Sequence, residues 1–211
     1  MGADKHRTFV GMVLATGMAM FLGHEAIAHD AGHTGGGFGS GGGFVSGLSH
    51  PILGLDHVVA MVAVGLWGAQ LGAPAIWVLP IAFPMVMAFG AAMSLLGFPL
   101  PAEEIGIACS AIVLGLMVLL EAKPPLAVAL VLVSAFALFH GHAHGTELPE
   151  GQNGLAYSLG FVIGTGLLHA IGIAIGCVGH LPKGKPCLRI AGAAVMGCGV
   201  YFLLASLGCF A

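Results

Sequence analysis

The side chains best suited to chemistry are histidines, of which the chain has eleven although only 7% of its residues are charged. His50, Asp56 and His57 lie in the eight residues HPILGLDH, together with a proline and a glycine. Imidazole and carboxylate groups together suit divalent Zn, Ni, Co, Cu or Fe. The plainer alternative is a buried His–Asp pair that only ties two helices together. An ionisable side chain inside a membrane costs at least about 2.5 kcal/mol, which favours a functional role.

A second polar group occurs in FHGHAHGTE, at the end of a long apolar run. His140, His144 and Glu147 are spaced i, i+4 and i+7, so a continuous helix would carry them on one stripe with metal-ligand spacing. His142 points elsewhere on such a helix and reaches the stripe only if Gly141 or Gly145 unwinds it. The alternative is a histidine-rich loop that binds metal loosely. Thiolates are absent from both groups, which argues against a Cu(I) site.

Further polar and aromatic residues have two interpretations each. Glu103 and Glu104 open a later helix, where the helix dipole alone favours acids, yet the topology below brings them level with the histidine stripe. His169, in LLHAIG, is either a relay or a packing residue. Phe83 is either a gate or a packing residue, and Pro84 beside it can kink the helix and open room near the site. The methionines are expected to pack rather than to bind metal.

The composition sets these residues in a membrane protein. Hydrophobic residues make up 58% of the chain and its mean hydropathy is +1.02. Such a chain cannot solvate the surface of a soluble globule, and six Lys and Arg cannot build a phosphate-binding face for nucleic acid. The five cysteines form no CxxC pair and are expected to be small apolar fillers. The expected fold is all-α, with six transmembrane helices near 44–71, 74–98, 103–121, 125–144, 154–180 and 186–210.

The first span is expected to be broken at its His-Pro motif. Pro51 fits the first turn of a helix and Ser49 fits its cap, so the helix should restart near His50. His50 and His57 are seven residues apart and should then share a face. In the later spans, Gly160-x-x-x-Gly164 and Gly172-x-x-x-Gly176 predict close helix packing, within one subunit or between several.

The first residues resemble a targeting signal. A basic start, an apolar run and the small residues around Ala28 predict a signal peptide at 1–28, cleaved after Ala28. Residues 29–43 would form an exported Gly/His-rich tail, and 44–211 the transmembrane domain. His29 and His33 in that tail either capture metal or belong to a spacer.

The positions of lysine and arginine predict the orientation. With the mature N-terminus outside, all six positive residues lie on the cytoplasmic side, as the positive-inside rule requires. The protein is thus expected in the inner (plasma) membrane, with both mature ends in the periplasm. Two groups of three spans, with histidine motifs in the first and fourth, predict a 3+3 repeat of inverted topology.

A resemblance adds to this interpretation. HPILGLDHVVAMVAVG is similar to the HPxxGxDHxxAMxAVG signature of the HupE/UreJ family of nickel permeases, and FHGHAHGTELP and LLHAIG also resemble that family. The resemblance implies uptake of Ni²⁺, or of Co²⁺, to supply hydrogenase or urease, with the ion as cargo and no prosthetic group. It implies that the functional positions are His50, Asp56, His57, Phe83, Glu104 and the segment from His144 to Glu147.

Transport without a nucleotide site in this chain is expected, because no GxxxxGK[ST] motif occurs. The alternatives are facilitated diffusion, gradient-driven exchange, or an ATPase on another subunit. A rival function is an intramembrane zinc-dependent hydrolase with Glu104 or Glu147 as general base. A third is a membrane metal sensor or storage module.

Overall fold

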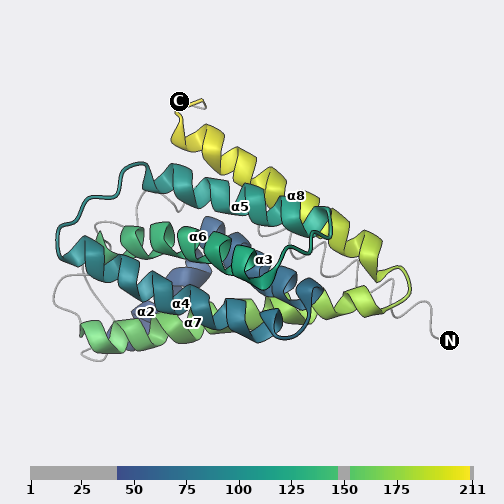
Figure 1. Ribbon diagram of the computed structural model, residues 1–211. Helices are drawn as coiled ribbons and strands as arrows, with labels where there is room; N and C mark the ends of the chain where they lie inside the picture. Colours follow the sequence, from purple (N-terminus) through teal and green to yellow (C-terminus); the bar gives the residue numbers. More distant parts are fainter. Residues whose placement is uncertain (1–41, 147–152, 210–211) are drawn as a thin grey trace. The chain divides into compact units, whose positions relative to one another are not determined.

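The computed structural model describes residues 42–146 and 153–209, and every regular element in these ranges is helical (Figure 1). The predicted signal peptide and almost all of the tail lie outside these ranges. The elements are α2 (Gly42–Leu53), α3 (Leu55–Leu71), α4 (Ala75–Leu95), α5 (Glu103–Leu119), α6 (Leu126–Thr146), α7 (Gly154–Cys177), the 3₁₀ helix η1 (Val178–His180) and α8 (Gly184–Ser206).

The first span is broken at Gly54, and not at His50 as predicted. Pro51 lies inside α2, and α2 and α3 meet at Gly54 with a bend of 80°. Gly54 has φ −82° and ψ 110°, so its extended backbone ends one helix and begins the next. Ser49 does not cap a helix, because its hydroxyl donates to the carbonyl of Ser46. The weak 3.4 Å bond from the Gly54 N–H to the His50 carbonyl marks the last turn before the bend.

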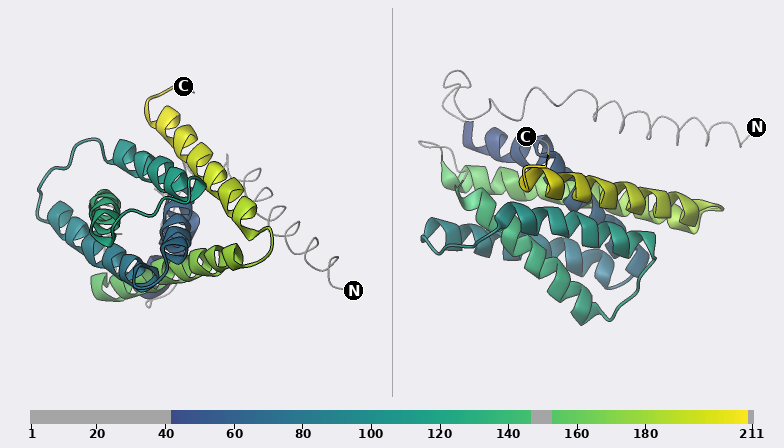
Figure 2. Two further views of the ribbon diagram at one scale, coloured as in Figure 1. Left: turned by 45° about the vertical axis from the view of Figure 1, so that its right-hand side comes forward. Right: turned by 90° about the horizontal axis from the view of Figure 1, so that it is seen from above.

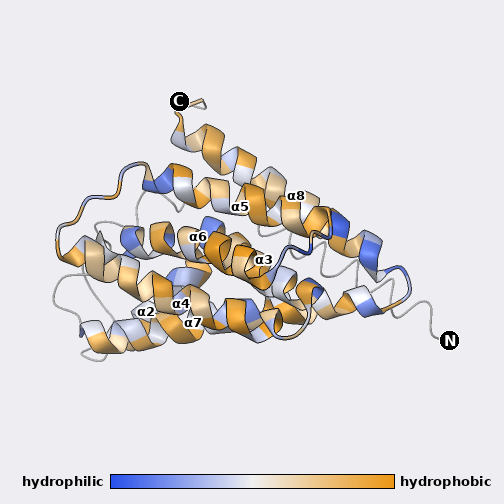
Figure 3. Ribbon diagram, in the orientation of Figure 1, coloured by the Kyte–Doolittle hydropathy of each residue, from blue (hydrophilic) through white to orange (hydrophobic). Residues whose placement is uncertain are grey.

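The helices have the length and apolarity of membrane spans. Four of them, α4, α6, α7 and α8, are long and apolar enough to cross a bilayer, and the bent pair α2 and α3 makes a fifth. With 17 residues, α5 is shorter than the roughly 20 that a span usually needs, so the six-span count stays a prediction. Large apolar side chains are exposed at four-residue spacing along α4, and apolar residues dominate the helices (Figure 3). That pattern is the lipid-facing stripe of an integral membrane protein; the exposed residues on α4 are Trp77, Ile81, Met85 and Phe89.

The helix α3 forms the centre of the packing. It contacts α4, α5, α7 and α8, and the two views in Figure 2 show it among them. Residues 63–69 are all buried, with Trp67 fully covered and its indole N–H donating to the carbonyl of Ala122. A helix that is apolar all round must be enclosed by others, and residues 63–69 meet that condition.

Three helix pairs pack closely enough to require small residues at their contacts. A Cβ on Gly141 of α6 would strike the backbone of Met87 on α4, and one on Gly160 of α7 would strike the backbone of Phe44 on α2. Gly115 of α5 and Gly192 of α8 face each other in the same way. The close packing predicted from the Gly-x-x-x-Gly spacing in α7 is therefore confirmed within this chain.

All basic residues of the described part lie at one end of the helices. Lys185 at the start of α8 approaches Glu121 after α5, with 4.0 Å between Nζ and Oε2. Lys123 follows α5, Lys183 precedes α8 and Arg189 lies in the second turn of α8, and all three side chains are exposed. Glu103 and Glu104 begin α5 at the opposite end. This grouping is what the predicted topology requires, while the side that it faces stays a prediction.

Other expectations have mixed outcomes. The five cysteines, all within the described ranges, are free, but Cys177, Cys187 and Cys209 are exposed, so they do not fill core space. Met87 is buried as expected, whereas Met85 is 69% exposed. The helix α4 runs without a break through Pro84.

Candidate metal site

The imidazole of His57 is held by its neighbour Asp56. Its Nδ1 lies 2.9 Å from Asp56 Oδ1, and the same oxygen accepts the backbone N–H of His57. Because an ionised carboxylate only accepts, Nδ1 carries the hydrogen and Nε2 keeps its lone pair. Within the described ranges that Nε2 is buried and has no hydrogen-bond partner. A histidine held in this way by a carboxylate is typical of metal ligands.

Gly54 makes room for this pair at the bend. A Cβ at Gly54 would lie 2.9 Å from His57 Nδ1 and 3.1 Å from Asp56 Oδ1. Any larger residue would therefore push against the two atoms that orient the imidazole. The same glycine thus ends α2 and leaves the space in which the His57–Asp56 pair forms.

His140, on α6, has the same tautomer as His57, with the hydrogen on Nδ1. Its Nδ1 lies 2.9 Å from the carbonyl of Phe136, one turn earlier on α6, and a carbonyl also only accepts. The side chain is fully buried, and its Nε2 has no hydrogen-bond partner in the part of the chain that the structure describes. Buried polar atoms are nearly always satisfied, so two such nitrogens on neighbouring imidazoles indicate a place for an electrophile.

The histidines of α2, α3 and α6 meet in a continuous series of ring contacts. The centroid of His144 lies 4.8 Å from that of His50 and 4.3 Å from that of His57. His57 in turn lies 5.2 Å from His140. The structure therefore brings together four of the predicted histidines, from both sequence motifs. His50 and His57 meet here from two helices bent against each other, and not from one shared helix face as predicted.

These ring spacings suit a shared ion. Two imidazoles bound to one ion at about 2.0–2.1 Å and about 90–109° have ring centres about 4.5–5.2 Å apart. Two of the observed centroid separations, 4.8 and 5.2 Å, fall in that range, and the third, 4.3 Å, lies just below it. As the side chains stand, no three His, Cys, Asp or Glu residues of the described ranges form a ready ligand group. Binding thus requires the side chains to rearrange around the ion.

The series continues past the histidines into the interior. Phe83 of α4 is fully buried, with its ring centroid 5.5 Å from that of His140 and 5.5 Å from that of His169 on α7. His169 is also buried, with 1% of its surface exposed. A phenyl ring thus separates the histidine cluster from the deeper imidazole.

His142 does not join the cluster. Its Nε2 lies 2.6 Å from the carbonyl of Phe98, and its Nδ1 lies 2.9 Å from Glu103 Oε1. The end of α6 is not unwound at Gly141 or Gly145, because the helix continues to Thr146. His142 therefore points away from His140 and His144. The hydrogen bond to Phe98 and the close approach to Glu103 place His142 against the α4–α5 connection and the start of α5.

The acids at the start of α5 do not reach the cluster either. Glu103 is engaged by His142. Glu104 is exposed and lines a separate pocket beside Ser206 of α8. Three of the predicted ligands, His29, His33 and Glu147, lie outside the described residues.

Two aromatic residues that the sequence did not single out complete the site. On α7, Phe161 lies 4.4 Å from His144 and 5.9 Å from His50 between ring centroids, and Tyr157 lies 6.0 Å from His50. Tyr157, Phe161 and His169 recur at multiples of four residues, and all three are buried. This spacing places the three residues on one face of α7. The sequence did not reveal that this face is buried, because apolar residues occur all around the helix.

An all-helical membrane protein with a buried imidazole cluster assembled from separate helices is the class that the fold and site define. A family model described as HupE / UreJ protein matches residues 17–202. Protein HupE of Rhizobium leguminosarum bv. viciae is 44% identical over 162 residues, which cover 77% of this chain and 85% of that protein. No solved structure matches the chain. The chain belongs to the HupE/UreJ family.

Proposed function

We propose that this protein is a secondary transporter or facilitator that imports Ni²⁺, or Co²⁺, across the inner membrane to supply hydrogenase or urease. Family membership supports the transport role, and the ion follows from the resemblance of the histidine motifs to those of nickel permeases. Nitrogen donors with few oxygens suit these ions better than Mg²⁺ or Ca²⁺, which prefer oxygen ligands.

One observation carries the proposal: the buried Nε2 atoms of His57 and His140, on neighbouring rings of different helices, have no hydrogen-bond partner in the described ranges. We assign the ion to this pair, with His144 and His50 completing the set of imidazoles. Asp56 acts through His57, whose ring it orients and makes more basic. Asp56 is thus a positioning residue rather than a direct ligand in this proposal.

The ion leaves the cluster past Phe83 toward His169. The phenyl ring fills the space between His140 and His169, so passage requires it to turn aside. An apolar residue at this level prevents a continuous water path while the ion is bound outside it. His169 then offers the next imidazole on the way in.

The membrane potential supplies a driving force. An inside-negative potential of 100 mV favours influx of a divalent cation by about 4.6 kcal/mol, twice the value for a single charge. Facilitated influx therefore needs no nucleotide site on this chain.

The helix packing supports the proposed 3+3 repeat. The helix α4 packs on α6, and α7 packs on α2 and α3. In such a repeat the α2–α3 pair corresponds to α6, α4 corresponds to α7, and α5 corresponds to α8. Exchanging corresponding helices turns the α4–α6 pairing into the pairing of α7 with α2 and α3, and it leaves the α5–α8 pair unchanged. An arrangement of this kind is common in transporters whose site lies between two repeats, and here the histidines come from the first and fourth spans.

Uptake of ⁶³Ni²⁺ into proteoliposomes tests the proposal. Vesicles with the wild-type protein should take up more of the ion than protein-free vesicles. His57→Ala, His50→Ala and Asp56→Ala should each reduce this uptake strongly. Ser110→Ala, which removes only a hydrogen bond to the Ile107 carbonyl within α5, is the matched control. Equal uptake by all variants would contradict the site, and no uptake by any would contradict the function.

The same vesicles separate a transporter from an intramembrane hydrolase. A hydrolase needs a metal with an open position and a nearby general base. Glu104, one predicted base, lines a pocket with Ser206 and not with the cluster. If the protein consumed a lipid or peptide substrate, and this activity required Asp56 and came without ion accumulation, the hydrolase would be favoured.

A further inference from the structure

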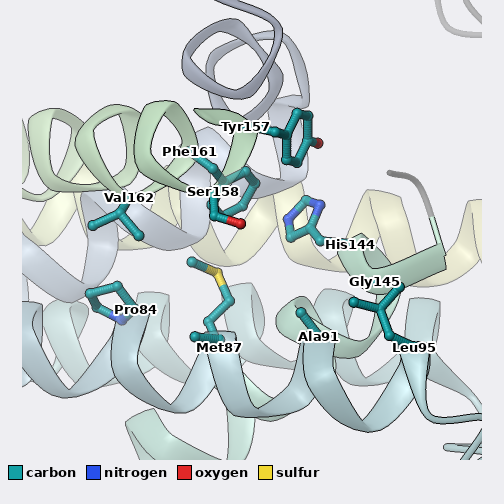
Figure 4. Close-up of a pocket in the computed structure, with 11 residues that line it drawn as sticks. Pro84, Met87, Ala91, Leu95, His144, Gly145, Tyr157, Ser158, Phe161 and Val162 are labelled. Carbon is teal, nitrogen blue, oxygen red and sulfur yellow. The ribbon is translucent and has the colours of Figure 1, made fainter. Parts of the chain in front are cut away.

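A pocket opens between α4 and α7, with the end of α6 as its floor (Figure 4). Its cavity volume is about 100 Å³. Met87 and Ala91 of α4 form one wall, Ser158 and Phe161 of α7 form the other, and the imidazole of His144 lies between them.

The pocket has an exposed rim along α4 and α7 and a buried floor. Leu95 and Ala88 of α4 and Ser158 and Val162 of α7 line it and are exposed. Met87, Phe161 and His144 are buried. At about 1.5 Å per residue, Met87 lies about 12 Å along α4 from Leu95, so the pocket extends over several turns of the helix.

The pocket lies on the boundary between two tightly packed groups of helices. One group is α4 with α6, joined where Gly141 meets the backbone of Met87, and the other is α7 with α2 and α3. Contact between α4 and α7 themselves is far less extensive. The histidine cluster crosses this same boundary, since His50 and His57 come from one group and His140 and His144 from the other. A loosely packed boundary that leads to the cluster is where access can form.

The opposite side of the cluster is closed. Phe83 is fully buried against His140 and His169, whereas His144 lines the open pocket. The structure thus has a pocket on the His144 side of the cluster, while the buried ring of Phe83 occupies the side toward His169.

We propose that the α4–α7 pocket is the mouth through which a partly hydrated divalent cation reaches His144. This inference rests on the proposed transport function and adds the route to the site. His144 on the floor is the first imidazole of the cluster that the ion meets.

Cysteine substitution in the lining of the pocket tests the route in the whole protein. The five natural cysteines are first replaced, and Ser158→Cys and Ala91→Cys are each introduced into that background. Their matched controls are the neighbours Leu159→Cys and Ala92→Cys, both exposed and outside the pocket lining. Each protein in proteoliposomes is treated with a positively charged methanethiosulfonate reagent, and ⁶³Ni²⁺ uptake is measured before and after.

We expect treatment to lower uptake about tenfold for Ser158→Cys and Ala91→Cys, because a fixed positive charge in a narrow, poorly hydrated mouth repels a divalent ion. Excess Ni²⁺ should slow the modification at both positions. The two neighbours should keep their uptake after treatment. If the thiols at these two positions stayed unreactive, or reacted without loss of uptake, the inference would be overturned while transport itself would stand. Absence of uptake in the untreated wild type would instead contradict the proposed function.

Discussion

Asp56 Oδ1 accepts two hydrogen bonds from His57, one from the ring Nδ1 and one from the backbone N–H, each 2.9 Å long. Two adjacent residues thereby fix both the direction of an imidazole and the nitrogen that carries its hydrogen. The other nitrogen, Nε2, is buried and has no hydrogen-bond partner in the described ranges, and the ring lies beside those of His140 and His144.

Replacing this carboxylate should weaken metal binding. Loss of a carboxylate that supports a histidine ligand typically costs about 10–100-fold in metal affinity, and we expect Asp56→Asn to fall in this range. Calorimetric titration of the detergent-solubilised protein with Ni²⁺ measures the change in Kd. Ser110→Ala should bind like the wild type. Unchanged affinity in Asp56→Asn would show that the carboxylate does not support the site.

The space at the bend should be equally sensitive. Gly54→Ala places a methyl group against His57 Nδ1 and Asp56 Oδ1, so the ring must move and ⁶³Ni²⁺ uptake should fall about tenfold. Gly166→Ala on α7 is the control, since a Cβ there would meet nothing within 4 Å. Equal uptake by both variants would mean that the site tolerates a displaced imidazole.

His142 and His144 should differ in what their loss affects. His142→Gln breaks contacts to the Phe98 carbonyl and to Glu103, so we expect a loss of about 1–3 kcal/mol in stability with most metal binding retained. His144→Gln should instead lose metal binding, because this ring contacts both His50 and His57. Thermal unfolding and Ni²⁺ titration of both variants distinguish the two roles. If His142→Gln were stable but unable to bind, the assignment would be reversed.

Phe83 should be important for stability as well as passage. Phe83→Ala removes a fully buried ring and should cost about 3–5 kcal/mol. Phe89→Ala on the same helix removes a ring that is 62% exposed, and its thermal unfolding in detergent should change little. A Phe83→Ala protein as stable as Phe89→Ala would argue that the ring does not pack as described.

The natural cysteines can report the orientation. Cys177 ends α7 and Cys187 lies in the first turn of α8, so the two flank the basic connection that contains η1. Cys209 follows α8 at the other end of the helices. All three cysteines are exposed. In intact spheroplasts, an impermeant thiol reagent should label a variant that retains only Cys209 and leave one that retains only Cys187 unlabelled. The reverse pattern would invert the predicted topology.

The helical class and the chemistry of the site follow from the sequence by itself. An apolar chain must satisfy its backbone internally in lipid, so long hydrophobic runs predict helices whatever their packing. The cost of ionisable groups in such runs singled out His50, Asp56, His57, His140 and His144 before any contact was known.

Only the tertiary structure decided which of these residues meet. Spacing along one helix separates His142 from His140 and His144, but only packing against Phe98 and Glu103 shows what His142 does instead. The break at Gly54 escaped prediction because a proline is tolerated in a helix that bends, while the extended glycine ends it. Phe161 joined the site through contacts between α7 and α6 that no local pattern encodes, since an aromatic residue in an apolar helix can face lipid or protein equally well.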